Sequence, residues 1–255
     1  MAKTPFSITG KVALITGGSR GIGKAMATLF AEQGAEVIVV SRKQEGVDAV
    51  ADEIKANGGK AHGIAAHMGD LEAINRLLAT LKERDLNIDI LINNAGISPP
   101  HDLEFVDTTP ELWDKIMAVN LRGPFFLTAA IGKQMAARGA GSIINISTTS
   151  SLLSQPEIGA YCVAKAAMNS MTGCFARELG PKGVRVNAIA CGVINTDMGA
   201  VVMRDEETFK GAMMMVPLKR IGEPSEIATT ALFLASEAAS YISGEILCAD
   251  GGVLS

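Results

Sequence analysis

Long apolar segments are missing from the sequence. No run of residues approaches the roughly 20 consecutive apolar residues that a helix needs to cross a bilayer. The first residues also lack the continuous apolar stretch of a secretory signal peptide. We therefore expect a chain that has no membrane partner and resides in the cytoplasm.

Cysteine and positive charge are also scarce. The cysteines form no C-x-x-C pair, which favours free thiols in a reducing compartment over disulfides or a metal site. The chain has 23 basic and 27 acidic residues, a formal net charge of −4, and so no broad basic surface. We expect no metal and no nucleic-acid partner. The four cysteines are Cys162, Cys174, Cys191 and Cys248.

Short apolar runs rich in β-branched residues recur along the 255 residues and alternate with helical patterns such as Ile74, Leu77 and Leu81. Runs of this kind are typical of parallel strands buried on both faces. The alternation predicts an α/β fold, a single doubly wound (Rossmann) domain whose parallel sheet has helices on both faces. We expect seven strands in this sheet, of which the apolar runs locate six. We assign residues 11–255 to this domain and residues 1–10 to a loosely attached lead-in. The apolar runs that locate strands are 12–15, 37–40, 88–92, 142–146, 184–189 and 245–248.

A glycine-rich turn, residues 16–23, joins the first predicted strand to the first predicted helix. Gly17 allows a tight turn, Gly21 lets a pyrophosphate approach the backbone, and Gly23 lets the helix pack closely on the sheet. Glycines also close turns that bind nothing, but here the helix directs free N–H groups and its positive dipole end at the turn. We predict a dinucleotide site, with Ser19, Arg20 and Ile22 as further contacts.

The second predicted strand ends at Ser41 and Arg42. An acidic residue at this place would bond the ribose 2′-hydroxyl and repel a 2′-phosphate. A hydroxyl and a guanidinium, with Arg20 as a second cation, suit a 2′-phosphate instead. We therefore expect NADP(H) to be preferred over NAD(H). The alternative is that both arginines are ordinary surface residues.

Tyr161 and Lys165 lie four residues apart, and the apolar stripe after them, Met168, Met171 and Phe175, keeps helical spacing. The pair therefore shares one face of a helix. A nearby ammonium stabilises phenolate, so we expect Lys165 to lower the pKa of Tyr161 and make it a usable proton donor or acceptor. Such a pair is common on surface helices, and its position after the fifth strand of a dinucleotide fold gives it weight.

Together these motifs resemble the short-chain dehydrogenase/reductase family over residues 10–252, with further matches at residues 93–96, 145–148 and 191–196. The resemblance implies that Tyr161 is the acid/base at the substrate oxygen and that Lys165 bonds the nicotinamide ribose. It implies that Asn120 holds a water linking Lys165 to solvent. The further implied cofactor contacts are Asn94, Ala95 and Gly96 beside the adenosine ribose, and Gly192, Ile194 and Thr196 in the loop that binds the carboxamide.

The residue expected to hold the substrate oxygen departs from the family pattern. Counting back thirteen positions from Tyr161 gives Thr148, where the family usually has a serine. A threonine hydroxyl can still donate and accept hydrogen bonds, although its branched Cβ restricts the side chain. We predict that Thr148 takes this role, with Ser147 as the alternative.

Two further departures concern the cofactor. Cys191 replaces the usual proline before the glycine of the carboxamide loop, which makes the loop less rigid. Its thiol is either buried or an oxidation site beside the nicotinamide. His67 and Met68 replace an aspartate that bonds adenine in many relatives, so adenine contact would rest on the backbone and Met68. His67 is either a cofactor contact or a simple strand-end residue.

The expected activity is that of a carbonyl reductase or alcohol dehydrogenase, which transfers a hydride between NADP(H) and a carbonyl or secondary alcohol. Residues 197–218 form the predicted substrate lid. Methionine adapts to irregular apolar shapes, so a methionine-rich lid favours an apolar or aromatic ketone or its alcohol. The same methionines would also suit the core of a lid helix. They are Met198, Met203, Met213, Met214 and Met215.

Three other functions compete with this one. A 3-oxoacyl-thioester reductase needs a basic patch to dock an acidic carrier protein, which Lys133, Arg138 and Arg177 could supply. A non-catalytic NADP(H)-binding sensor need not retain Tyr161 and Lys165, and a methyltransferase has no use for that pair. The resemblance also implies a homo-oligomer, a tetramer or dimer, built through long helices and the last strand.

Overall fold

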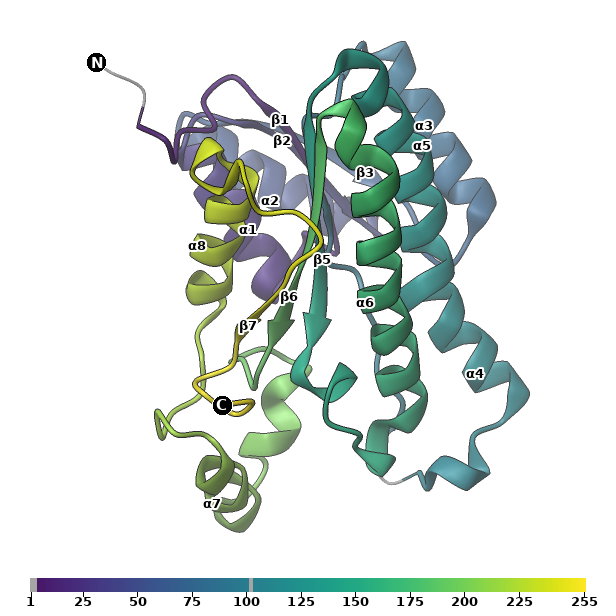
Figure 1. The fold of residues 1–255 in the computed structure, drawn as a ribbon, viewed down its shortest axis with the longest axis vertical. Coiled ribbons are helices and arrows are strands. Elements are labelled where there is room, and N and C mark those ends of the chain that lie inside the picture. The colour runs from purple at the N-terminus through teal and green to yellow at the C-terminus, as the bar shows by residue number, and fades with distance from the viewer. Residues whose placement is uncertain (1–3, 101–102) are drawn as a thin grey trace.

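Seven parallel strands form one sheet in the computed structural model, which describes residues 4–100 and 103–255 (Figure 1). Their order is β3-β2-β1-β4-β5-β6-β7. The predicted seven-stranded, doubly wound α/β fold is confirmed. The strands are β1 (Val12–Thr16), β2 (Glu36–Ser41), β3 (Lys60–Ala65), β4 (Ile90–Asn93), β5 (Gly141–Thr148), β6 (Val184–Cys191) and β7 (Ile246–Ala249).

Six of the strands lie where the apolar runs predict them, within two residues at either end. The exception is β3, whose sequence KAHGIA contains a lysine, a histidine and a glycine. It forms an edge of the sheet and pairs only with β2, so partner strands do not bury it on both sides. A strand in that position needs fewer large apolar residues, which weakens its signal in the sequence.

Helices cover both faces of the sheet and divide the core into two layers. Phe30 and Val50 belong to one buried cluster, and Leu77 and Phe175 belong to the other. The helices on the first face are α1 (Gly21–Glu32), α2 (Gln44–Ala56) and α8 (Pro224–Ala235). Those on the second face are α3 (Leu71–Glu83), α5 (Gly123–Arg138) and α6 (Gly159–Leu179).

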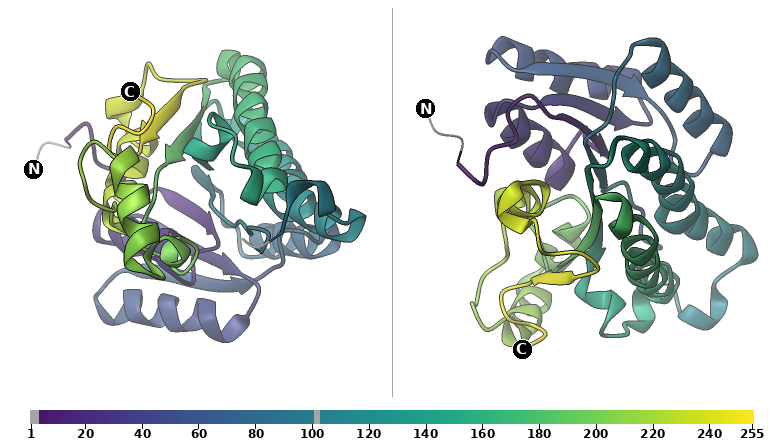
Figure 2. Two further views of the ribbon diagram at one scale, coloured as in Figure 1. Left: turned by 90° about the horizontal axis from the view of Figure 1, so that it is seen from below. Right: turned by 45° about the horizontal axis from the view of Figure 1, so that its top comes forward.

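The strand order reverses between β1 and β4, because the chain leaves β3 at one edge and returns to the centre of the sheet. In sheets of this type, ligands bind at such a switch point, beyond the carboxyl ends of the strands. The predicted lid contains α7 (Glu206–Met215), which lies beyond the arrowheads of β5 and β6 (Figure 1). Figure 2, left, looks onto this edge, where α7 stands on one side of the strand ends and α6 on the other.

The lead-in is held more firmly than the sequence suggests. The Ile8 side chain is buried in the core, and the Phe6 ring lies 6.4 Å from the Phe233 ring of α8. The Ala238 N–H donates to the Pro5 carbonyl at 2.8 Å. The lead-in is therefore attached from Pro5 onward.

Within the two described ranges, no helix combines the length and apolar character needed to cross a membrane.

Candidate active site

The glycine loop at the switch point adopts a backbone that requires glycine. Gly17 and Gly21 have φ angles of +67° and +52°, in the left-handed region. A Cβ on Gly17 would lie 2.8 Å from the Asn94 amide nitrogen, and one on Gly23 would overlap the Gly17 carbonyl oxygen. Gly23 thus makes room for the loop's own backbone. The loop is held in a shape that exposes its backbone to a ligand.

The amino end of α1 can bind an anion through its backbone N–H groups. Arg20 is the N-cap residue with extended backbone, and among the described residues no side chain caps the helix. The first turn also contains no acidic residue. The N–H groups of this turn are therefore available to phosphate oxygens, which the helix dipole favours. The observed loop fits the pyrophosphate of a dinucleotide.

Ser19 and Ser41 connect the glycine loop to the end of β2, since their hydroxyls lie 3.0 Å apart. Arg42 is exposed just beyond that strand. Arg20 does not complete a clamp with Arg42 here, because its guanidinium is paired with Asp197 at 2.7 Å. The structure thus gathers Ser19, Ser41 and Arg42 at this end of the sheet and turns Arg20 toward Asp197, where the predicted lid begins.

The segment after β4 connects the glycine loop to the middle of the site. The Asn94 side chain donates to the carbonyls of Thr16 at 2.9 Å and Gly17 at 3.2 Å. The N–H groups of Asn94 and Ala95 both donate to the Thr16 hydroxyl, at 3.0 and 3.1 Å. Buried side chains that make several hydrogen bonds fix backbone positions. Asn94 and Ala95 therefore lie directly against the loop that precedes α1.

Gly96 continues this path to Asn120 and Lys165. A Cβ on Gly96 would lie 3.0 Å from the Asn120 Oδ1 and 3.8 Å from the Lys165 Nζ. Asn120 lies in a π-helical turn, Ala118–Arg122, between α4 (Pro110–Met117) and α5. Its amide exchanges two hydrogen bonds, of 2.9 and 3.0 Å, with the backbone of Ile97. π-Helical turns often occur at functional sites, and this one was not evident from the sequence.

Tyr161 and Lys165 lie in the first two turns of α6, on the same face, as the spacing predicts. The Lys165 side chain is buried, and its Nζ donates to the Ile146 carbonyl of β5 at 2.7 Å. The Nζ is 5.8 Å from the centroid of the Tyr161 ring. Burial lowers the pKa of Lys165 to about 8, because the charged form loses its hydration.

The expected net lowering of the Tyr161 pKa by Lys165 is wrong. Burial raises the pKa of the Tyr161 phenol above its ordinary value, and the nearby thiols of Cys191 and Cys162 raise it further. Hydrogen bonding with Thr148 acts in the opposite direction but is a smaller effect. The ammonium of Lys165 donates to the Ile146 carbonyl, so desolvation determines the direction in which the pKa of Tyr161 shifts.

Thr148, rather than Ser147, faces Tyr161. Successive side chains of a strand point to opposite faces. The Ser147 hydroxyl contacts the Ser151 hydroxyl at 3.3 Å, and Ser151 in turn accepts from Asn169 of α6 at 2.7 Å. The Thr148 hydroxyl lies close enough to Tyr161 to act on the pKa of its phenol, which it lowers. The geometry favours Thr148 for the substrate-binding role.

Ser150 and Gln155 hold Thr148 in place and were missed by the sequence analysis. The Ser150 N–H donates to the Thr148 hydroxyl at 3.2 Å, and the two hydroxyls lie 3.3 Å apart. The Ser150 hydroxyl donates to the Gln155 amide oxygen at 2.8 Å. Serine and threonine at the end of a strand commonly make such local turns. No spacing rule identified this pair.

The loop after β6 contacts the glycine loop. Ile194 is buried and forms an isolated bridge with Gly222. The Thr196 hydroxyl lies 3.3 Å from the Ile194 carbonyl, and a Cβ on Gly21 would meet the Thr196 methyl at 3.2 Å. Gly192 packs against the backbone of Asp250 so closely that a Cβ would lie 2.7 Å from it. The loop after β6 therefore lies against the glycine loop at Gly21.

The Cys191 thiol is buried at the end of β6, where Cys191 pairs with Thr148 in the sheet register. Burial raises its pKa to about 12, so the thiol stays protonated. Of the two interpretations left open by the sequence, the buried thiol is confirmed over an exposed oxidation site. The protein's own side chains and backbone are enough to bury this thiol.

The residues after β3 divide between core and surface. Met68 is 4% exposed and belongs to the core cluster, so its side chain is committed to packing. His67 lies two residues beyond the strand and is half-buried, and its Nδ1 accepts from the Gly69 N–H at 3.0 Å. Any adenine contact at this place falls to His67 and the backbone rather than to the Met68 side chain.

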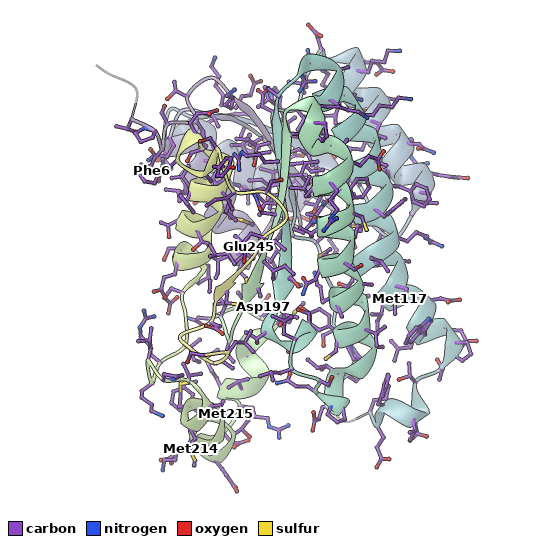
Figure 3. The ribbon with its side chains drawn as sticks, viewed as in Figure 1. Phe6, Met117, Asp197, Met214, Met215 and Glu245 are labelled. Atoms are coloured by element: carbon purple, nitrogen blue, oxygen red, sulfur yellow. The ribbon has the colours of Figure 1, made fainter. Side chains whose placement is uncertain are left out.

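Apolar side chains gather at the carboxyl edge of the sheet. Met213 of α7 is buried, whereas Met198, Met203, Met214 and Met215 are at least 40% exposed. Figure 3 shows Asp197 near the strand ends and Met214 and Met215 below it on α7. The methionines of the predicted lid are thus divided between the core and the surface. Leu152 and Leu153, in the turn after β5, are also exposed.

Comparisons with known proteins agree with this arrangement. The family model described as enoyl-(acyl carrier protein) reductase matches residues 17–254. The chain is 40% identical to dehydrogenase/reductase SDR family member 4 of Bos taurus, over 96% of this chain and 88% of that protein. It is 40% identical to a 3α-hydroxysteroid dehydrogenase of Mediterraneibacter gnavus, over 96% and 97%.

A solved structure has the same fold. It belongs to an NAD(P)-dependent gluconate 5-dehydrogenase candidate from Beutenbergia cavernae, with NADP bound at low occupancy. The two chains are 35% identical and superimpose with a TM-score of 0.94, over 98% of this chain and 99% of that one.

Proposed function

The chain belongs to the short-chain dehydrogenase/reductase family and is an oxidoreductase that acts on alcohol or carbonyl groups with a nicotinamide cofactor; from this premise we propose that it is an NADP(H)-dependent carbonyl reductase or alcohol dehydrogenase. One observation carries the proposal. A continuous path of contacts leads from Gly17 through Asn94 and Gly96 to Lys165, which lies beside Tyr161. A dinucleotide bound along this path would end next to a phenol.

The described residues fit such a cofactor. The backbone of the glycine loop, with Gly17, Ser19, Gly21, Ile22 and Gly23, would hold the pyrophosphate at the amino end of α1. The nicotinamide supplies or accepts the hydride. The remaining contacts that we propose are Asn94, Ala95, Gly96 and His67 toward the adenosine, Tyr161 and Lys165 at the nicotinamide ribose, and Gly192, Ile194 and Thr196 at the carboxamide.

NADP(H) is the preferred cofactor in this proposal. The Ser19 and Ser41 hydroxyls lie beside the cation Arg42, and the strand end carries no acidic residue at these positions. Hydroxyl and guanidinium donors suit a 2′-phosphate. Arg20 is a second donor if it exchanges its partner Asp197 for the phosphate.

Tyr161 is proposed to exchange a proton with the substrate oxygen. Its raised pKa keeps the phenol protonated at neutral pH, which suits it to donate a proton during carbonyl reduction. Thr148, held by Ser150, donates a second hydrogen bond to the same oxygen and orients it. Lys165 and Asn120 both lie next to Gly96. They are proposed to return protons from solvent to Tyr161 through a water held by Asn120.

The substrate is proposed to be an apolar or aromatic ketone or its alcohol. Support comes from the exposed apolar side chains that surround the strand ends, including Leu152, Leu153 and Met198. The steroid named for the M. gnavus relative is apolar, whereas the gluconate named for the structural relative is not. Residues 197–218 act as the lid over this substrate in the proposal, within a single domain of residues 11–255.

A 3-oxoacyl-thioester reductase remains the second candidate, because the matching family model carries an acyl-carrier-protein name. Of the basic residues considered for docking a carrier, Lys133 and Arg177 are exposed. The Arg138 guanidinium instead lies 3.9 Å from the Asp89 carboxylate and donates to the Ile88 carbonyl. This engagement weakens the predicted docking patch.

A second copy of this chain is the proposed macromolecular partner. The groove of about 600 Å³ between α5 and α6 is lined by Phe125, Phe126, Cys174 and Phe175. The Phe125 and Phe126 side chains are 42% and 47% exposed. Large exposed aromatic patches mark interfaces, and a symmetric pair would cover both copies of this one.

The four free thiols support a reducing, cytoplasmic location.

Binding and turnover with the purified chain test the proposal. NADPH and NADH binding is measured calorimetrically, and oxidation of each is followed with aromatic ketones, steroid ketones, ketoses and 3-oxoacyl thioesters. We expect tighter binding of NADPH and the largest kcat/KM with an apolar ketone. Equal or tighter NADH binding would overturn the cofactor preference, and turnover of ketoses alone would overturn the substrate class.

A further inference from the structure

Asp197 lies where it can compete with the cofactor for Arg20. Its carboxylate accepts from the Arg20 guanidinium at 2.7 Å, across 177 positions of sequence. Arg20 is the N-cap of α1 inside the glycine loop, and Asp197 begins the lid segment beyond Thr196. The ion pair therefore joins the glycine loop to the loop after β6, the two segments proposed to hold the cofactor.

Neighbouring contacts fix this juxtaposition. Thr196 packs against Gly21, where an added Cβ would lie only 3.2 Å from the Thr196 methyl. The Thr196 hydroxyl also accepts from the Gly199 N–H at 3.2 Å, which holds the backbone on either side of Asp197. The carboxylate is thus kept within reach of Arg20 by backbone geometry as well as by charge.

The ion pair itself is weak. The Arg20 and Asp197 side chains are 72% and 75% exposed, and solvent-exposed ion pairs of this kind contribute little net stability. A 2′-phosphate has more negative charge than a carboxylate and accepts several hydrogen bonds from one guanidinium. Arg20 can therefore exchange Asp197 for phosphate at small cost, whereas a ribose 2′-hydroxyl offers no comparable gain.

We propose that Asp197 is a specificity-determining residue that holds Arg20 in an intramolecular ion pair and so moderates the preference for NADP(H) over NAD(H). The inference rests on the proposed NADP(H) preference. Each molecule of NADPH that uses Arg20 must first displace Asp197, but NADH need not. Removing the carboxylate should then strengthen NADPH binding selectively.

The test is calorimetric titration of NADPH and of NADH into wild type, D197N, R20A and the double variant at low salt. We expect D197N to lower the Kd for NADPH about two- to fivefold, the range of a surface ion pair, and to leave the Kd for NADH within twofold. In the R20A background the D197N effect should vanish. Added salt should shrink it as well, because salt screens exposed charges.

Glu207, an exposed residue in the first turn of α7, provides the matched control. E207Q removes one negative charge from the lid and leaves Arg20 and Asp197 intact, so the Kd for NADPH should not change. If R20A weakens NADPH binding and D197N does not tighten it, the competition is refuted while the cofactor preference stands. If R20A leaves NADPH binding unchanged, the role of Arg20 in the proposed preference fails as well.

Discussion

Among single residues, Lys165 combines a proposed role in proton transfer with a cost in folding stability. Its side chain is 2% exposed, and burial lowers its pKa from 10.5 to about 8. The unfolded chain therefore holds the proton more tightly than the folded chain does. At neutral pH this costs about 3 kcal/mol of folding free energy, since one pKa unit corresponds to about 1.4 kcal/mol. The cost is relieved as the pH rises from about 8 to 10.5.

K165M should consequently raise the melting temperature at pH 7 and abolish turnover. The gain in stability over wild type should shrink as the pH rises from about 8 toward 10.5, where the wild-type lysine is neutral in both states. Thermal unfolding followed at several pH values measures this. K182M, at an exposed lysine, is the control and should change little. A K165M protein less stable than wild type at pH 7 would contradict the burial argument.

Thr148 and Ser147 can be separated by substitution, because their side chains lie on opposite faces of β5. T148A removes the hydroxyl beside Tyr161 and should lower kcat about 10²- to 10³-fold, the usual loss of one donor to a reacting oxygen. T148S should restore most of it. S147A should leave kcat nearly unchanged. Steady-state kinetics with NADPH decide this, and the reverse pattern would place the role on Ser147.

Among elements, the junction of β1 and α1 depends on the smallest side chain. G23A would place a methyl group on the Gly17 carbonyl oxygen and against the Asn94 amide, so the loop must shift. We expect NADPH affinity to fall at least tenfold, measured by calorimetry. G211A, at an exposed glycine of α7 with no atom near its Cβ, should leave affinity intact. Unchanged affinity in G23A would show that the loop does not hold the cofactor.

Elements with strong periodic signals were predictable from the sequence. Buried strands such as β1 and β6 read as continuous apolar runs, and α6 reads as a stripe of apolar residues. The edge strand β3 was not, since its sequence KAHGIA contains no continuous apolar run. The π-helical turn at Asn120 also escaped, because no residue pattern distinguishes it from the α-helices on either side.

The site was predictable as a set of positions but less so as a set of interactions. Spacing placed Tyr161 and Lys165 together, yet the direction of the Tyr161 pKa depends on burial, which spacing does not give. Likewise, Arg20 was expected to face a phosphate, and only the folded chain brings Asp197 to it. Contacts between distant segments arise from the topology and have no local signal.

At the scale of the whole molecule, the aromatic groove on α5 and α6 should hold copies of the chain together. F126E introduces a charge into the lining of this groove and should shift the mass in light scattering toward the monomer. V106E places the same charge on another exposed apolar residue, outside the groove, and should not. An F126E protein with the wild-type mass would exclude this face as the interface.

We propose that hydride transfer by this protein depends above all on the Tyr161 hydroxyl. The most direct test is single-turnover oxidation of bound NADPH by Y161F, compared with wild type on the best ketone of the panel. We predict that Y161F binds NADPH with wild-type Kd but transfers the hydride at least about 10²-fold more slowly, the typical contribution of a general acid. Transfer at the wild-type rate would contradict the central claim that this phenol protonates the substrate.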